Sequence, residues 1–381
     1  MKVGKIGQFN RIVIKVGSAL LLDNNEEFNR DWLNNLSNEI EQLHNRRTEI
    51  LIVSSGAVAI GSTYLRKKRS HMNLNEMQAA AAMGQAQLVM EWQDSFKSSG
   101  IYTAQILLTR SDTENKKRFL NSKDTLLTLI KYDVIPIINE NDTVATEELR
   151  YGDNDRLAAR VAQMTSADLL ILLSDVDGMY TSNPKTNQTA KHIPVIDNLN
   201  EEIFSMADIA DSNYGSGGMI TKLKAAKIAT SAGCATIVTD GLKKTPLTSL
   251  IEGGKCTYFP ARSNSKSTRK QWLSGYLDTS GSFKIDDGAK VALEKGGSLL
   301  PVGLTEIEGT FERGDVVAII DANNTELGKG MTAYSSVEAK QIIGCQSDSI
   351  KDKLGYKNSS EIIHRDDMTL NEFSKQNNKI I

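Results

Sequence analysis

Short apolar runs alternate with longer amphipathic stretches from the start of the chain to about residue 260. The short runs are almost continuously apolar, which is typical of parallel strands that are covered on both faces. We expect strands at residues 12–15, 50–53, 104–108, 134–138, 169–173 and 236–239, and helices at residues 31–44, 77–96, 121–130 and 155–164. This alternation predicts an α/β fold, a three-layer αβα sandwich with a mostly parallel central sheet.

The pattern changes after Phe259. Residues 260–269 are rich in serine and basic residues, and from Gly281 onwards glycines separate short runs such as residues 316–320. Frequent turns between short strands are typical of a small β-barrel. We therefore expect a first domain over residues 1–260, a linker over 261–278, a β-barrel over 279–358 and a polar, frayed tail over 359–381.

The composition is that of a soluble globular protein. The chain has 381 residues, of which 40% are hydrophobic, and a formal charge of −2, so it has no polyelectrolyte character toward nucleic acid or membrane. No apolar run approaches the roughly 20 residues that a membrane helix needs, and the first residues lack a cleavable-signal pattern. Three widely spaced cysteines indicate a reducing, cytoplasmic location, and four scattered histidines show no metal-ligand spacing.

Three glycine-bearing segments lie where a strand or loop gives way to a helix. They are residues 15–18 (KVGS), residues 54–57 (SSGA) and residues 215–222 (GSGGMITK). Backbone N–H groups and the helix dipole favour an anion at such positions, so we expect a nucleotide-phosphate site. Taken singly, each segment also fits a plainer interpretation: a solvated lysine at a strand end, a serine helix cap, and a flexible helix entry.

Three polar clusters also follow predicted strands or open a predicted helix. Residues 139–142 (NEND) and 174–180 (SDVDGMY) come directly after strands, and residues 151–155 (YGDND) precede a helix. Open α/β sheets bind ligands at the carboxyl ends of their strands, and Asn and Asp can hold an ammonium group and a carboxylate. Asp153 or Asp155 would serve equally well as a helix cap. No Walker A or dinucleotide fingerprint is present.

In this order, the segments KVGS, SSGA, INEND, GDND, SDVDGMY and GSGGMITK resemble the amino-acid kinase superfamily. The stretch INENDTVATEE together with GDND is similar to the glutamate 5-kinase family in particular. The C-terminal segments RKQWLSGYL, RGDVVAIID and LGKGMTAYSS resemble a PUA domain. Ser174 and Ser216 stand where relatives often have threonine, and both keep a hydroxyl group.

The resemblance implies ATP-dependent phosphorylation of the side-chain carboxylate of L-glutamate, the first step of proline biosynthesis, with Mg²⁺ held mainly by the nucleotide phosphates and no protein metal cage. A carboxylate is already a nucleophile at neutral pH, so no general base is required. Carried over by motif, the catalytic residues are Lys15, Lys222 and Asp155. The glutamate-binding residues are Ser55, Asp142 and Asn154. The ATP-binding residues are Lys15, Gly17, Ser174, Asp175, Ser216, Gly217, Gly218, Met219, Ile220, Thr221 and Lys222.

The same resemblance implies feedback inhibition by proline and a homo-oligomer. The nearest alternative is another kinase of the superfamily, acting on acetylglutamate, aspartate, carbamate or a nucleoside monophosphate. An RNA-binding protein is a further alternative, because PUA domains elsewhere bind RNA. Residues 281–381 carry 12 Lys and Arg against 16 Asp and Glu, a formal charge of −4, which disfavours contact with phosphate backbones.

Overall fold

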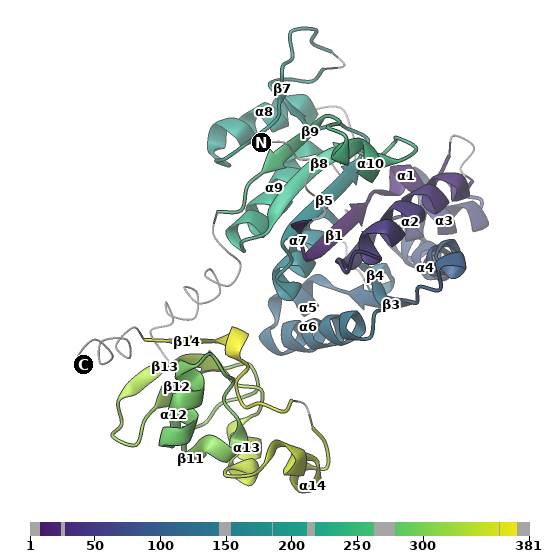
Figure 1. The fold of residues 1–381 in the computed structure, drawn as a ribbon. Coiled ribbons are helices and arrows are strands. Elements are labelled where there is room, and N and C mark those ends of the chain that lie inside the picture. The colour runs from purple at the N-terminus through teal and green to yellow at the C-terminus, as the bar shows by residue number, and fades with distance from the viewer. Residues whose placement is uncertain are drawn as a thin grey trace. The chain divides into compact units, whose positions relative to one another are not determined.

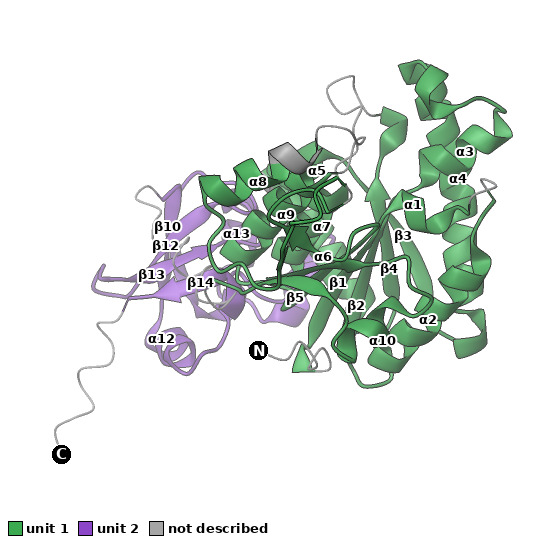
Figure 2. Cartoon of the chain, turned by 90° about the horizontal axis from the view of Figure 1, so that it is seen from above, with its two compact units in different colours: residues 1–265 green, residues 266–381 purple. Residues whose placement is uncertain are grey.

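The computed structural model describes residues 8–23, 27–144, 154–184, 186–211, 218–262, 279–357 and 359–371. The chain divides into two units, residues 1–265 and residues 266–381 (Figure 2). The expected linker lies almost wholly outside the described residues. No helix in the described part of the chain has both the length and the apolar character that a membrane crossing needs.

The first unit is built on a seven-stranded sheet in the order β3-β4-β2-β1-β5-β8-β9 (Figure 1). Neighbouring strands run parallel except β9, which is antiparallel to β8. The strands are β1 (Arg11–Val16), β2 (Glu49–Ser54), β3 (Thr103–Leu108), β4 (Ile135–Glu140), β5 (Leu169–Ser174), β8 (Ala235–Asp240) and β9 (Cys256–Phe259). All six strands expected from the apolar runs are confirmed, and β9 is an addition.

Helices cover both faces of this sheet (Figure 1). Along β1 the side chains alternate between the two cores: Ile12 and Ile14 pack on one side and Val13 on the other. The first core is closed by α1 (Ser18–Leu21), α2 (Arg30–His44), α3 (Ala57–Tyr64), α4 (Leu74–Ser95) and α10 (Pro246–Ile251). The second is closed by α6 (Lys116–Lys131), α7 (Asn154–Thr165), α8 (Glu201–Asp211) and α9 (Met219–Ser231). The predicted three-layer αβα sandwich is confirmed.

Helices α3 and α4 approach each other at the level of the backbone. A Cβ atom added at Gly61 would lie 1.8 Å from the carbonyl oxygen of Ala80, and one at Gly84 would lie 1.9 Å from that of Ala57. No side chain fits at such distances, so both positions require glycine. The contact fixes the start of α3, and with it the turn that follows β2, against the middle of α4.

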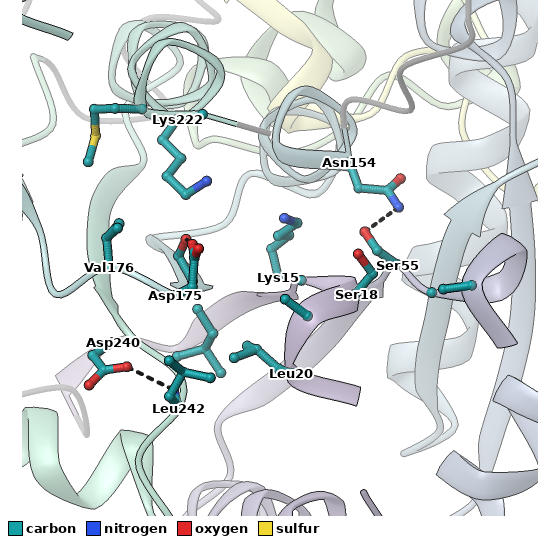
Figure 3. A pocket seen from close by; sticks show the side chains of 18 of the residues that line it. Lys15, Ser18, Leu20, Ser55, Asn154, Asp175, Val176, Lys222, Asp240 and Leu242 are labelled. Carbon is teal, nitrogen blue, oxygen red and sulfur yellow. Dashed lines mark hydrogen bonds between the residues drawn. The ribbon is translucent and has the colours of Figure 1, made fainter. Parts of the chain in front are cut away.

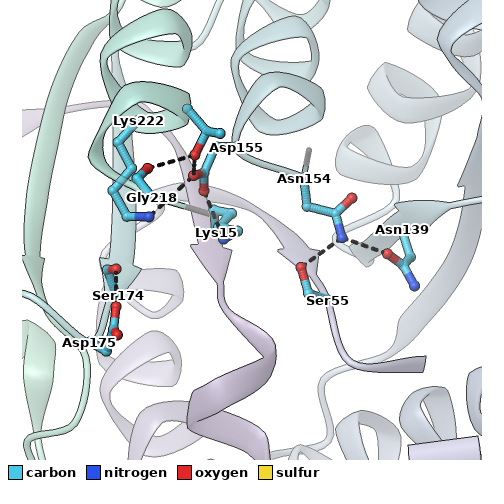
Figure 4. Close-up of polar contacts among 10 residues, drawn as sticks. Lys15, Ser55, Asn139, Asn154, Asp155, Ser174, Asp175, Gly218 and Lys222 are labelled. Carbon is cyan, nitrogen blue, oxygen red and sulfur yellow. Dashed lines mark hydrogen bonds and ion pairs between the residues drawn. The ribbon is translucent and has the colours of Figure 1, made fainter. Parts of the chain in front are cut away.

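The loops after β1, β2, β4 and β5 all leave the sheet at its carboxyl edge, because these strands are parallel. Helix α7 begins at the same edge with Asn154, and α9 begins there with Met219 (Figure 4). Helix α5 (Arg110–Glu114) follows β3, and a two-stranded hairpin, β6 (Met179–Tyr180) with β7 (His192–Ile193), follows β5. Segments that are far apart in the sequence therefore meet at one edge of the sheet.

The second unit is the small β-rich domain expected at the C-terminal side. Its sheet has the order β11-β10-β12-β13-β14, and Phe283, Phe311 and Tyr334 lie in its core. The strands are β10 (Gly281–Ile285), β11 (Leu304–Gly309), β12 (Val316–Ile320), β13 (Glu326–Met331) and β14 (Met368–Leu370). The helices are α12 (Asp287–Glu294), α13 (Ser336–Ile342) and α14 (Ile350–Leu354).

The expected start of a frayed tail at residue 359 is wrong. Ile362 and Ile363 are fully buried in the second core, and β14 pairs antiparallel with β13. The segment is polar on average, so its few apolar residues give little signal in the sequence. The two isoleucines pack in the core, and β14 is hydrogen-bonded to β13, so the segment is held in the domain. Residues 372–381 of the expected tail lie outside the described residues.

Candidate functional site

A cavity of about 580 Å³ opens at the carboxyl edge of the first sheet (Figure 3). It is lined by residues from the loops after β1, β2, β4 and β5 and from the starts of α7 and α9. Ten of the residues expected from the sequence line it: Lys15, Gly17, Ser55, Asp142, Asn154, Ser174, Asp175, Gly218, Met219 and Lys222. Asp155 and Thr221 adjoin it through contacts to these residues, and Ile220 does not line it. Ser216 and Gly217 lie outside the described residues.

One buried carboxylate holds both lysines of the cavity (Figure 4). Lys15 Nζ, from β1, lies 2.7 Å from Asp155 Oδ1, and Lys222 Nζ, from α9, lies 3.3 Å from Oδ2. Thr221 Oγ1 donates to the same Oδ2 at 2.7 Å. The side chains of Asp155 and Lys222 are 2% and 5% exposed, so both charges depend on each other rather than on water. Two ammonium groups from distant segments therefore meet at one carboxylate beside the cavity.

The electrostatics of Asp155 follow from these contacts. Burial alone would raise its pKa, but the charges of Lys15 and Lys222, with hydrogen bonds from Lys15 and Thr221, outweigh burial and hold the pKa of this carboxyl well below its usual range. Asp155 is therefore ionised at every physiological pH. The ionised carboxylate holds the ammonium groups of Lys15 and Lys222 close to each other.

A chain of side-chain hydrogen bonds holds the turn after β2 (Figure 4). Asn154 Nδ2 donates to Ser55 Oγ at 2.7 Å and to Asn139 Oδ1 at 2.9 Å. Asn139 Nδ2 in turn donates to Gln85 Oε1 of α4 at 2.7 Å. Asn139 stands in a cluster that the sequence singled out, but nothing in the sequence connected Gln85 with the site. Spacing along a helix does not reveal which distant strand it will contact.

Asp142 lines the same part of the cavity, in the short 3₁₀ turn Asp142–Val144 that follows β4. Burial raises its pKa to about 6, and the nearby charge of Arg69 opposes this only partly. The carboxyl group is therefore ionised at neutral pH but accepts a proton in mild acid. A partly buried carboxylate of this kind attracts a cationic group of a ligand.

The opposite part of the cavity carries a tight loop and an apolar wall. In the loop, Ser174 Oγ donates to Asp175 Oδ1 at 3.0 Å, and Gly178 has a φ of 142°, which favours glycine. The wall is formed by Leu20, Val176 and Leu242 (Figure 3). Val176 belongs to the segment 174–180, whereas Leu20 and Leu242 lie outside every segment expected at the site. Apolar side chains beside a few directed polar groups are typical of small-molecule sites.

Metal-binding side chains do not cluster in the described part of the chain. No group of three or more His, Cys, Asp or Glu residues there is arranged to hold a metal ion. Asp175 is a carboxylate that lines the cavity. Mg²⁺ commonly binds through one or two carboxylates and otherwise through phosphates and water, so this donor set fits a metal carried by a nucleotide.

Comparison with known proteins assigns both units. The amino acid kinase family model matches residues 10–240, and the PUA domain model matches residues 281–354. The chain is similar to the glutamate 5-kinase of Bartonella henselae, with 48% identity over 97% of this chain and 98% of that protein. It is 46% identical to the glutamate 5-kinase of Bradyrhizobium diazoefficiens over 96% of this chain and 98% of that protein.

Solved structures of other kinases also resemble the chain. The UMP kinase of Ureaplasma parvum matches with a TM-score of 0.45 and 20% identity, over 66% of this chain and 98% of that chain. The carbamate kinase of Giardia lamblia, bound to AMP-PNP, matches with a TM-score of 0.47 and 16% identity, over 67% of this chain and 99% of that chain. The family model over residues 10–240 and the nearly full-length identity to glutamate 5-kinases lead to one conclusion: the chain belongs to the amino acid kinase family, in its glutamate 5-kinase branch, and carries a PUA domain.

Proposed function

We propose that this chain transfers the terminal phosphoryl group of ATP to the side-chain carboxylate of L-glutamate. The product is L-glutamate 5-phosphate, the first intermediate of proline biosynthesis. One observation carries the proposal: Lys15 and Lys222, from distant segments, converge on Asp155 at a cavity that also holds amino-acid-binding groups. The name that the near full-length relatives share supports glutamate as the acceptor.

The cavity divides into two halves on either side of Lys15 (Figure 3). Ser55 and Asn154 lie on one side, where they suit glutamate. Asp142 also lines the cavity, and we assign it to the same substrate. Asp175 and Lys222 lie on the other, where we place the nucleotide. The remaining nucleotide-binding residues of this proposal are Gly17, Ser174, Ser216, Gly217, Gly218, Met219, Ile220 and Thr221.

The chemistry needs charge and position more than it needs acid–base catalysis. The side-chain carboxyl of glutamate has an ordinary pKa of about 4.3, so it is ionised at neutral pH and attacks as it stands. Its approach to the terminal phosphate is opposed by like charge, and the ammonium groups of Lys15 and Lys222 offset that repulsion. Mg²⁺ bound to the nucleotide would neutralise further phosphate charge, and Asp175 is a carboxylate that could hold it.

An ADP-release assay across acceptors tests the proposed reaction. The purified chain, with ATP and Mg²⁺, is given L-glutamate, N-acetylglutamate, L-aspartate, carbamate or UMP in separate reactions. We expect turnover with L-glutamate to exceed that with each other acceptor. Faster turnover with any of the others would assign the chain to a different kinase of the superfamily.

Asp142 makes glutamate binding dependent on pH. Its pKa is raised to about 6 by burial, so it is ionised above this pH and protonated below it. If ionised Asp142 holds the substrate ammonium group, the KM for glutamate rises as the pH falls through about 6. Initial rates between pH 5 and 8 measure this. In Asp142→Asn the KM should exceed that of the wild type at neutral pH, approach it near pH 5, and no longer change near pH 6.

The thermal stability of Asp142→Asn shows whether Asp142 serves substrate binding or the fold. Since the folded pKa of Asp142 lies above its ordinary value, ionising it opposes folding, and the stability present below pH 4 is lost as the pH rises through about 6. Asp142→Asn should therefore unfold at the same or a higher temperature than the wild type at pH 7. A glutamate KM that is unchanged in this variant would contradict the proposed contact.

Proline is the proposed feedback inhibitor. It carries an ammonium group and a carboxylate like glutamate but lacks the side-chain carboxylate, so it can occupy Ser55, Asp142 and Asn154 without being phosphorylated. We expect proline at millimolar concentrations to raise the apparent KM for glutamate. Initial rates that stay constant over this range would remove regulation by proline from the proposal.

The remaining parts of the proposal concern organisation. We propose a cytoplasmic homo-oligomer in which residues 1–260 carry the catalysis and the PUA domain is a structural or regulatory appendage. The excess of acidic residues over residues 281–381 argues against RNA as its partner. Sedimentation of the purified chain, with and without added tRNA, reports both the oligomeric state and any association with RNA.

A further inference from the structure

The hydrogen-bond chain that begins at Ser55 continues through two residues that do not belong to the glutamate-binding set. Asn154 bonds to Asn139, and Asn139 bonds to Gln85. All three amide side chains are buried: Asn139 is 1% exposed, and Asn154 and Gln85 are each 7% exposed. Buried amides that bond to one another constrain each other's orientation, because each must meet a donor with an acceptor.

A backbone group fixes the direction of this chain. The N–H of Glu140 donates to Asn139 Oδ1 at 2.9 Å, and a backbone N–H can only donate. Asn139 must therefore present its oxygen on this side, where Asn154 also contacts it at 2.9 Å. The Asn154 atom at that contact must then be the donor Nδ2. The opposite orientation of Asn139 would place two donors against each other, and that of Asn154 would place two acceptors against each other, in a buried site.

The orientation of the Asn154 amide decides which hydrogen bonds Ser55 Oγ and Asn154 Oδ1 can offer to a ligand. Because Asn154 Nδ2 donates to Ser55 Oγ, the hydroxyl proton of Ser55 is left to donate to a ligand. Asn154 Oδ1 is a buried acceptor that receives no hydrogen bond from any side chain or backbone group of the described residues. A ligand that brings one anionic oxygen and one N–H donor satisfies both groups. This is the pattern of an amino acid with a free ammonium group.

We infer that Gln85 is a positioning residue that acts through Asn139 and Asn154 to select acceptors with a free ammonium group. Gln85 Oε1 accepts from Asn139 Nδ2 and so stabilises the one orientation of Asn139 that agrees with the Glu140 N–H. It does not line the cavity, so it reaches the ligand only through the other two amides. The neighbouring Gly84 locks this part of α4 to the start of α3, which fixes the position of Gln85.

The inference rests on the proposed function, since it names the acceptor half of that site. N-acylated glutamate keeps one N–H that could meet Asn154 Oδ1, but it loses the positive charge and gains the bulk of the acyl group, so it should bind less tightly. The inferred role of Gln85 also separates binding of the ammonium group from binding of the carboxylates. Loss of the Gln85 contact should weaken the first more than the second, because the carboxylates lose at most the hydrogen bond from the Ser55 hydroxyl.

The experiment compares L-glutamate with glutarate, which has both carboxylates but no ammonium group. Gln85→Met keeps the length of the side chain and removes the acceptor for Asn139. We expect the KM for glutamate to rise about tenfold, while kcat, the KM for ATP and the inhibition constant of glutarate each change less than about threefold. Equal weakening of glutamate and glutarate, or no change for either, would overturn the proposal.

Two further variants control for folding. Gln85→Glu keeps an oxygen toward Asn139 Nδ2, so its KM for glutamate should lie within about threefold of the wild type. A rise in KM as large as that of Gln85→Met would contradict the proposed role of the hydrogen bond to Asn139. Gln87→Met changes a glutamine of the same helix that donates to Glu91 instead, and it should leave binding unchanged. Calorimetric titration of glutamate into each variant gives the same comparison without turnover. If the wild type fails to phosphorylate glutamate, the proposed reaction is refuted. The role of Gln85 in binding is then decided by the calorimetric titrations alone.

Discussion

Lys222→Ala is expected to lower kcat by roughly 10²–10³-fold, by analogy with removal of one donor from a site that stabilises developing negative charge. The Lys222 ammonium group lies 3.3 Å from Asp155 Oδ2, at the N-terminal end of α9, and its side chain is only 5% exposed. A buried positive charge of this kind acts on the transferring phosphoryl group with little screening by water. In Lys222→Ala, the part of the cavity where we place the nucleotide loses this positive charge.

Lys15→Ala should give a loss of the same order, because Lys15 provides the other ammonium group on Asp155. The measurement is the steady-state rate of ADP release at saturating ATP and glutamate. Lys224→Ala is the matched control, since Lys224 lies on the same helix with an exposed side chain and should retain wild-type turnover. Turnover near the wild-type value in folded Lys15→Ala or Lys222→Ala would refute the proposed mechanism.

Asp155→Ala is expected to lower the free energy of unfolding by about 3–5 kcal/mol, the usual effect of removing one partner from a buried ion pair. It leaves two buried ammonium groups, those of Lys15 and Lys222, without their common carboxylate. Either lysine can lose its proton, which lowers the free-energy cost of burying an unpaired ammonium group. The site would then also carry less positive charge. Urea unfolding followed by tryptophan fluorescence measures the change, and turnover should fall with it.

The pH dependence of this loss has a defined sign. The folded pKa of Asp155 lies well below its ordinary value of about 3.9, so its contribution to stability is complete above that value and is lost as the pH falls through the folded pKa. The difference between wild type and variant should therefore be constant from pH 5 to 8 and shrink only in strong acid. Asp94→Ala, at an exposed position of α4, should differ little from the wild type at any pH. A variant of Asp155 as stable as the wild type would contradict the ion-pair network.

The parallel part of the first sheet could be predicted from the sequence because strands buried on both faces must be apolar throughout. That rule identifies each strand without knowledge of its neighbours. Strand β9 (Cys256–Phe259) was not predicted, since it is a short antiparallel strand at one edge of the sheet. The segment around Ile362 and Ile363 was misjudged for a related reason: two apolar residues in a polar stretch give no periodic signal.

The site was predicted in part for the same physical reason. Residues that follow the carboxyl ends of parallel strands must come together, so Lys15, Ser55 and Asp142 could be expected at one cavity. The contacts of Asn139 with Gln85 could not, because they join a strand to the middle of a helix that is 54 positions away in sequence. Such contacts follow from how α4 packs on the sheet, which local patterns do not encode.

The glycine contacts between α3 and α4 also limit how this pocket can be redesigned. Backbone meets backbone at Gly61 and Gly84, so neither helix can slide or tilt without a collision with the other. An engineer who wishes to admit a bulkier acceptor has no room to gain by moving these helices closer together. The space must come from shortening individual side chains in the pocket, and a library directed at glycine replacement along the helix pair would return mostly misfolded protein.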